Sequence, residues 1–243
     1  MYVIKQHKPM SEEKKQAARI QTSILNPLEK KVLVWLAERM PAWVTSDMLT
    51  FVGFLGAVIM ATGYALANLN LNWLWLSCFG LVVNWFGDSL DGSLARVRNT
   101  QRKTYGFYID HNVDVINETI MFVGVGLSPL VNMSFAMFAL VAYFMLSIYV
   151  YIDCHLKGEM RLTYAGMGPT EFRLILIIVN ICFIYIPWLS QWKKPITLFH
   201  NDFQIGLFDY IAVAAAFAIF AAYIVSFFKD LKYFSEKDPI KKD

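Results

Sequence analysis

The sequence is short of cysteine and of charge, and each shortage excludes a class of protein. Its three cysteines, Cys78, Cys154 and Cys182, lie in apolar segments, are odd in number and form no CxxC pair. They predict small buried hydrophobic residues rather than a disulfide framework or a zinc site. Charged residues make up 17% of the 243 residues, against 57% hydrophobic residues and a mean hydropathy of +0.43. An ordinary soluble domain is thereby excluded, and an integral membrane protein is indicated.

The first residues also lack a short apolar core followed by a small-residue cleavage site, so we expect no secretory signal peptide. A hydrocarbon core of roughly 30 Å takes about 20 apolar residues per helix. Apolar runs predict an all-α protein with six transmembrane helices, at 44–66, 71–95, 106–131, 133–156, 171–192 and 206–228. The expected organisation is a cytoplasmic arm with an amphipathic helix over 1–43, a transmembrane catalytic domain over 44–228 and a basic tail over 229–243.

The amphipathic helix is predicted at "NPLEKKVLVWLAERMP". Asn26 is the expected N-cap, Pro27 the first helical residue and Glu29 the N3 residue. Apolar residues follow at helical spacing, namely Leu28, Val32, Trp35, Leu36 and Met40. Its cations and tryptophan favour a helix in the membrane interface, and the alternative is a soluble helix packed on its own chain.

The distribution of the 22 Lys and Arg residues predicts the orientation of the chain. Twenty fall on one side, and only Lys193 and Lys194 fall on the other. Both termini are therefore expected in the cytoplasm. The basic arms at 5–31 and 229–242 are interpreted as solvated segments or contacts with anionic lipid, and nucleic acid is not needed to explain them.

Four aspartates interrupt the second and third predicted spans. A charge at the centre of a membrane helix costs about 2.5–3.5 kcal/mol, so compensation is required. Spacings of three and four residues place one set on one helix face and a second set on one face of the next helix. The sets are Asn84, Asp88, Asp91 and Ala95, then Asp110, Asp114 and Asn117. A nine-residue loop lets the helices return as antiparallel neighbours, so the two acidic faces are expected to meet near the cytoplasm.

Facing carboxylates repel one another unless protons or cations neutralise them. An all-oxygen shell suits Mg²⁺, Mn²⁺ or Ca²⁺, and two such ions suit phosphoryl transfer. The alternative is an internal salt-bridge network with Arg96 or Arg98. Gly87, Gly92 and Gly106 serve either close helix packing or approach of the backbone to a phosphorylated ligand, for which Arg96 is a phosphate contact.

These residues read DxxDGxxAR(x9)GxxxDxxxD, which resembles the motif of the CDP-alcohol phosphotransferase (CDP-alcohol phosphatidyltransferase) family. The resemblance implies transfer of a phosphate-linked group from a CDP-linked donor to an alcohol, with release of CMP. It implies two divalent cations, Mg²⁺ or Mn²⁺, with Asp88, Asp91 and Asp110 as ligands and Asp114 as ligand or general base. The implied nucleotide and phosphate site consists of Asn84, Gly92, Ala95, Arg96 and Gly106. A homodimer is expected because family members commonly pair.

Three stretches are similar to the choline and ethanolamine branch of the family. They are "FYIDHNVD" with His111, "GPTE" at 168–171, and "DCHLKG" at 153–158 with His155 as a general base. This similarity implies a CDP-choline or CDP-ethanolamine donor and a lipid alcohol such as diacylglycerol as acceptor. The alternative is a CDP-diacylglycerol donor and a small polar alcohol acceptor.

Each of these stretches also has a structural interpretation. His111 can hydrogen-bond locally, Thr170 can cap the fifth span with Glu171 in its first turn, and Asp153 can satisfy His155. A further set of cations, Lys157, Arg161 and Arg173, either grips substrate phosphates or reflects membrane topology.

Two rival functions use the same acids. A cation transporter would line a path across the bilayer with polar groups, but the outer halves of the second and third spans are almost entirely apolar. A protein that binds a CDP-lipid without turnover would keep the same ligand residues.

Overall fold

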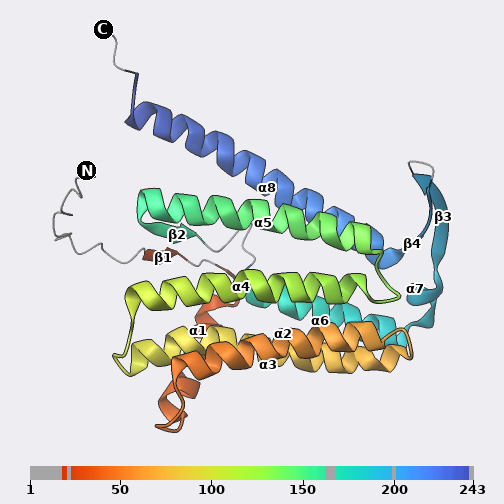
Figure 1. Cartoon of the computed structure of the whole chain (residues 1–243), viewed down its shortest axis with the longest axis horizontal. Coiled ribbons are helices and arrows are strands. Elements are labelled where there is room, and N and C mark those ends of the chain that lie inside the picture. Colours follow the sequence, from red (N-terminus) through yellow and green to blue (C-terminus); the bar gives the residue numbers. More distant parts are fainter. Residues whose placement is uncertain (1–17, 21–22, 162–167, 199–200, 241–243) are drawn as a thin grey trace, which may run out of the picture.

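The computed structural model of the chain describes residues 18–20, 23–161, 168–198 and 201–240. Six long helices lie over these residues: α2 (Ser46–Leu66), α3 (Leu74–Val97), α4 (Lys103–Gly126), α5 (Met133–Lys157), α6 (Pro169–Tyr185) and α8 (Leu207–Lys237). They run along a common direction, with α8 diverging from the others towards the C-terminus (Figure 1). The helical fold class is therefore as the sequence predicts, and one of these helices overlaps each of the six predicted apolar segments.

Three of these helices are long and apolar enough to cross a membrane: α2, α5 and α8. The acids of α3 and α4 interrupt their apolar runs, and α6 has 17 residues, fewer than the roughly 20 that span a bilayer. Six spans, and a cytoplasmic location of both termini, therefore stay predictions.

The element boundaries differ from the predicted ones at the end of the bundle opposite the acids. The fifth apolar segment does not run to 192, because α6 ends at Tyr185 and a short helix, α7 (Pro187–Gln191), follows. Proline disfavours helical backbone in the residue before it, which explains the break. Two strands then form an antiparallel hairpin, β3 (Lys193–Leu198) and β4 (Asn201–Gly206). This hairpin is not among the elements predicted from the sequence.

The other end of the bundle carries a second small sheet and an extension. Strands β1 (Ala18–Ile20) and β2 (Glu159–Arg161) pair in parallel and join the N-terminal segment to the end of α5. Helix α8 continues to Lys237, so the basic tail predicted from residue 229 begins as helix.

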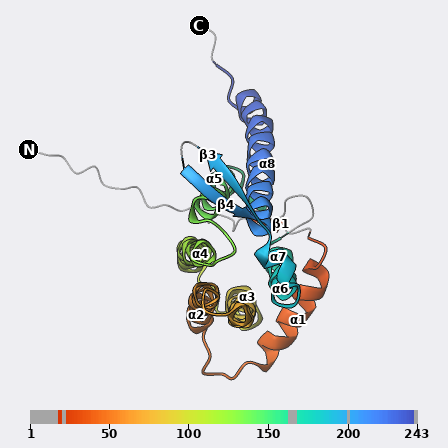
Figure 2. The same cartoon turned by 90° about the vertical axis from the view of Figure 1, so that its right-hand side faces the viewer.

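Helix α1 (Asn26–Arg39) lies across the side of α3 and α6 (Figure 2). The predicted N-cap is wrong by one residue, because Leu25 occupies the cap position and Asn26 is the first helical residue. The buried face of α1 packs Leu33 and Ala37 into a cluster that includes Leu90 and Leu94 of α3.

The opposite face of α1 is exposed and mixes apolar with cationic residues: Leu28, Lys30, Lys31, Trp35 and Arg39. One face of this helix therefore packs on the chain itself, as the alternative interpretation has it. The other face has the composition of a helix at a membrane surface, and a location in the interface stays a prediction.

Helices α2 and α3 touch backbone to backbone through glycines. A Cβ atom on Gly56 would lie 2.3 Å from the Asn84 nitrogen, and one on Gly87 would lie 2.2 Å from the Gly53 nitrogen. Small residues let membrane helices approach this closely. Gly87 is therefore a packing residue, and the contact fixes the position of Asp88 relative to α2.

The part of the bundle away from the acids is closed by packed apolar side chains. Met60, Tyr64, Leu74 and Leu81 are almost completely buried there. The Tyr64 hydroxyl donates to Asn180 Oδ1 at 2.8 Å, which ties α2 to α6. This packed layer argues against a polar ion path through the bundle.

Candidate active site

Three carboxylates from two helices meet in one group. Asp88 on α3 and Asp110 and Asp114 on α4 each offer an oxygen, and these oxygens lie within 4.8 Å of one another. All three side chains are half-buried. The predicted convergence of the two acidic faces is thus observed for these residues.

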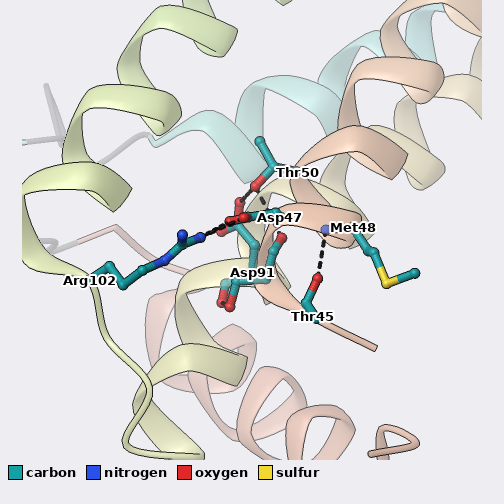
Figure 3. A network of polar contacts seen from close by, with 7 residues as sticks. Thr45, Asp47, Met48, Thr50, Asp91 and Arg102 are labelled. Carbon is teal, nitrogen blue, oxygen red and sulfur yellow. Dashed lines mark hydrogen bonds and ion pairs between the residues drawn. The ribbon is translucent and has the colours of Figure 1, made fainter. Parts of the chain in front are cut away.

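Asp91 lies outside this group of three and is held by α2. Thr50 Oγ1 donates to Asp91 Oδ2 at 2.6 Å, and Ser46 Oγ donates to the Asp91 carbonyl at 3.0 Å. Figure 3 shows Thr50 reaching this carboxylate from α2. The hydroxyl orients the side chain, and a metal-ligating role for Asp91 stays a prediction.

Arg102, in the loop before α4, pairs with Asp47 in the first turn of α2 (Figure 3). Its guanidinium also lies 3.9 Å from the centre of the Tyr105 ring. Hydrogen bonding to Asp47 raises the pKa of Arg102 further above its ordinary value, so this residue stays charged at any pH used for assay. The pair connects the loop to α2.

Arg173 of α6 forms an ion pair with one acid of the group. Its Nη2 atom lies 2.6 Å from Asp88 Oδ2, and its Nε donates to Asn84 Oδ1 at 3.0 Å. Asn84 is 1% exposed and its Nδ2 donates to the Gly53 carbonyl at 2.9 Å. The Asn84 amide is therefore engaged inside the protein, where it supports Arg173, and the predicted contact of Asn84 with a nucleotide gains no support.

The salt-bridge alternative named Arg96 and Arg98, whereas the ion pair observed at the acids is made by Arg173. Arg98 donates to the carbonyls of Met40, Pro41 and Val44 and so holds the turn between α1 and α2. Arg96 donates to Ser93 Oγ at 2.9 Å and its side chain is exposed. Arg98 therefore has a structural role, whereas phosphate binding by Arg96 stays a prediction.

The three small residues of the motif differ in their surroundings. A Cβ atom on Gly106 would meet nothing within 4 Å, whereas one on Gly92 would lie 3.3 Å from Arg96 Nη1. Ala95 is half-buried one turn further along α3. Gly106 thus has open space where a side chain would lie, and its role in making room for a ligand stays a prediction.

His111 follows the local interpretation. Its Nδ1 lies 2.7 Å from the Phe107 carbonyl oxygen one turn earlier on α4. The ring stacks on Phe107 at 4.0 Å and meets the edge of Tyr151 at 4.8 Å. These contacts fix α4 against α5 next to Asp110.

His155 lies on an exposed stretch of α5, in a groove lined otherwise by the side chains of Ile148, Tyr151, Ile152 and Leu156. Asp153 does not satisfy it, because Asp153 pairs with Lys157 at 2.6 Å. No contact within the described residues joins His155 to the acid group. Its predicted role as a general base therefore has no geometric support.

The remaining predicted substrate contacts have internal partners or lack a described side chain. Lys157 Nζ also lies 2.6 Å from Asp230 Oδ2, to which the Tyr149 hydroxyl donates, so Lys157 ties α5 to α8. Arg161 ends β2, and its side chain is outside the described part of the chain.

The "GPTE" stretch forms the start of α6, but Thr170 is not its cap. Glu171 Oε2 accepts from the Gly168 nitrogen at 2.9 Å, and Glu171 Oε1 accepts from the Leu25 nitrogen at 2.8 Å. Thr170 instead donates to Glu29 at 2.6 Å. The stretch therefore joins α6 to α1.

Glu118 is the residue near the site that the sequence analysis missed. It receives a hydrogen bond from Tyr143, and its Oε2 atom is buried with no hydrogen-bond partner. The spacing in the sequence could have identified it, because Glu118 follows Asp114 by four residues and continues the acidic face of α4.

The donor set fits a hard divalent cation. Three carboxylates share one small region, a fourth lies one turn along α3, and oxygen ligands of this kind suit Mg²⁺ or Mn²⁺ rather than zinc. A cation there would also offset the repulsion among these acids.

The sequence profile that describes CDP-alcohol phosphatidyltransferase matches residues 43–228, which include Asp88, Asp91, Asp110 and Asp114. The chain belongs to this family. It is therefore a membrane-integral transferase of phosphate-containing groups. The prediction of the family and reaction class is confirmed.

Two relatives from other organisms are similar to this chain. A phosphatidylinositol phosphate synthase of Cutibacterium acnes is 32% identical over 104 residues, which cover 43% of this chain and 44% of that protein. An archaetidylinositol phosphate synthase of Pyrococcus horikoshii is 26% identical over 183 residues, which cover 72% of this chain and 90% of that protein. The match to the first thus spans less than half of its length.

These relatives change the expected substrate class. Both are named for an inositol phosphate lipid, and neither is a choline or ethanolamine phosphotransferase. The three stretches that suggested that branch also have other uses here, since His111 and Glu171 are bound locally and His155 lies apart from the acids. The alternative branch, with a CDP-diacylglycerol donor, is therefore better supported than the aminoalcohol branch.

Proposed function

We propose that the protein transfers a phosphatidyl-type group from a CDP-linked lipid to a small phosphorylated alcohol of the inositol phosphate class, with release of CMP. The observation that carries this proposal is the pairing of Arg173 with Asp88 beside the three-carboxylate group, within a chain similar to two inositol phosphate lipid synthases. A guanidinium at this position supplies a phosphate contact next to the acids.

The proposal assigns two roles to the acids of the site, namely cation binding and acceptance of a proton. Asp88, Asp110 and Asp114 would hold two divalent cations together with Asp91, and the chemistry that such cations supply is polarisation of the attacked phosphate and stabilisation of the departing CMP. Asp114 accepts the proton of the attacking hydroxyl, because it belongs to the acid group, whereas His155 lies apart from it among the described residues.

Room for the donor nucleotide is proposed at the start of α4. Gly106 opens onto free space, and Arg96 lies exposed above Gly92 on α3. The active site is proposed to face the cytoplasm, since the basic loop between α3 and α4 borders it. The homodimer expected for the family is retained as part of the proposal.

The test is a matrix of donors and acceptors with purified protein in lipid, scored by CMP release. We expect CMP from CDP-diacylglycerol with inositol phosphate, only when Mg²⁺ or Mn²⁺ is present, and little with unphosphorylated inositol. Release of CMP only from CDP-choline or CDP-ethanolamine with diacylglycerol would restore the aminoalcohol branch. Turnover with glycerol phosphate or serine alone would keep the donor and change the acceptor.

A further inference from the structure

Glu29 of α1 connects three helices through one atom. It is 9% exposed, and its Oε1 accepts from Trp85 Nε1 of α3 at 2.8 Å and from Thr170 Oγ1 of α6 at 2.6 Å. The partners are 56 and 141 residues away in sequence. Glu29, which the sequence predicts as a helix-capping residue, thus connects α1 with α3 and α6.

The contacts of Glu29 lie beside the ion pair of the candidate active site. Trp85 precedes Asp88 by three residues on α3, and Thr170 precedes Arg173 by three residues on α6. Residues three apart are neighbours on a helix surface. The same two helices are therefore linked twice in succession, once through Glu29 and once through the Arg173–Asp88 pair.

A second contact fixes α1 to α6 independently of Glu29. The Leu25 nitrogen donates to Glu171 Oε1 at 2.8 Å, at the start of both helices. The apolar face of α1, with Leu33, packs on α3. Helix α1 therefore rests on both helices, and Glu29 is the point where it holds them at a set separation.

We infer that Glu29 is a positioning residue for the metal site, which holds α3 and α6 together so that Asp88 faces Asp110 and Asp114 while Arg173 stays in reach. The inference rests on the metal site of the proposed function. Loss of the carboxylate leaves the indole and hydroxyl donors without their acceptor and removes one of the two polar links between the start of α6 and α3. The carboxylate of Asp88 would then be displaced from those of Asp110 and Asp114, and the affinity of the site for a cation would fall.

The test measures Mn²⁺ binding to the purified protein in lipid nanodiscs, by the electron paramagnetic resonance of free Mn²⁺. We expect Glu29→Ala to weaken Mn²⁺ binding by about tenfold, the size typical of residues that orient metal ligands. Glu29→Gln keeps an oxygen acceptor and should stay within about twofold of wild type. Thr170→Val removes one donor, keeps the side-chain shape and should give a smaller loss, which covers the case in which Glu29→Ala does not fold.

Two control variants separate positioning from general stability. Glu38→Ala removes an exposed acid of the same helix and should leave Mn²⁺ binding unchanged. Leu33→Ala removes apolar packing between α1 and α3 and should lower the melting temperature without a tenfold loss of Mn²⁺ affinity.

Wild-type Mn²⁺ affinity in Glu29→Ala would overturn the inference, and so would an equal loss in Leu33→Ala. Wild-type protein that does not bind Mn²⁺ would overturn it as well. Mn²⁺ binding that follows the expected order of variants, without CMP release from any CDP-linked donor, would overturn the proposed function and support the positioning role.

Discussion

Arg173 and Asp88 form an ion pair 2.6 Å long between α6 and α3, at the edge of a group of three carboxylates. Both side chains are mostly covered, with exposures of 16% and 23%. The arginine therefore supplies positive charge to one acid of a group that otherwise repels itself.

Arg173→Gln should destabilise the metal-free protein by about 2 kcal/mol, because it leaves a half-buried carboxylate without its cation. Mn²⁺ should restore most of this loss, since the added cation takes over the neutralising role. Thermal unfolding with and without Mn²⁺ measures both effects. Equal destabilisation in the two conditions would show that Arg173 acts only as a packing residue.

Asp110→Asn should reduce CMP release by about 100-fold or more, because it removes a charge from the proposed cation site. The matched control is Asp47→Asn, which changes an acid at the start of α2 that pairs with Arg102 outside the group. CMP release at saturating Mg²⁺ distinguishes them. Comparable activity of Asp110→Asn and wild type would remove Asp110 from the site.

Glu118→Gln tests the acid that the motif does not contain. Removing its charge should weaken Mn²⁺ binding a few-fold, because a nearby carboxylate attracts the cation, and should raise the metal-free melting temperature by relieving repulsion with the other acids. Calorimetric titration with Mn²⁺ and a melting curve suffice. A gain in Mn²⁺ affinity would contradict this account of Glu118.

Gly56→Ala and Gly106→Ala should fail in different ways. The added carbon meets α3 backbone at Gly56, so the bundle should lose about 3 kcal/mol or not fold. At Gly106 it meets open space, so folding should be normal while the apparent KM for the CDP-linked donor rises. Melting curves and steady-state kinetics separate the two. Unchanged kinetics in Gly106→Ala would place the nucleotide elsewhere.

His155→Ala decides between the two general bases that the motif left open. The side chain lies in an exposed, mainly apolar groove on α5, so we expect CMP release within about twofold of wild type from pH 6 to 9. Asp114→Asn should instead abolish it. Loss of turnover in His155→Ala with intact Mn²⁺ binding would show that His155, and not Asp114, is the general base.

The acid group could be predicted because charges in an apolar chain are conspicuous and their spacing defines a helix face. Asp88, Asp110 and Asp114 needed only that periodicity and a short loop to be brought together. The residues that support them carry no such local signal. Arg173 is 85 residues from Asp88, so their contact depends on how α6 packs.

Local patterns also assigned some residues to the wrong partner. Glu29 and Thr170 both fit helix-capping patterns, yet each binds the other across 141 residues. Capping preferences describe one helix in isolation, whereas these side chains lie where two helix starts meet. Tertiary packing therefore determined their use.

The glycine contact between α2 and α3 constrains how substrate choice can vary in this fold. With the two backbones already touching, a larger side chain at Gly56 or Gly87 cannot be added unless a helix moves. Larger side chains reach the acids or their neighbours from α5 and α6, because Tyr151 contacts His111 and Arg173 pairs with Asp88. Efforts to redirect this transferase to another alcohol should begin with those two helices and leave the glycine contact between α2 and α3 unchanged.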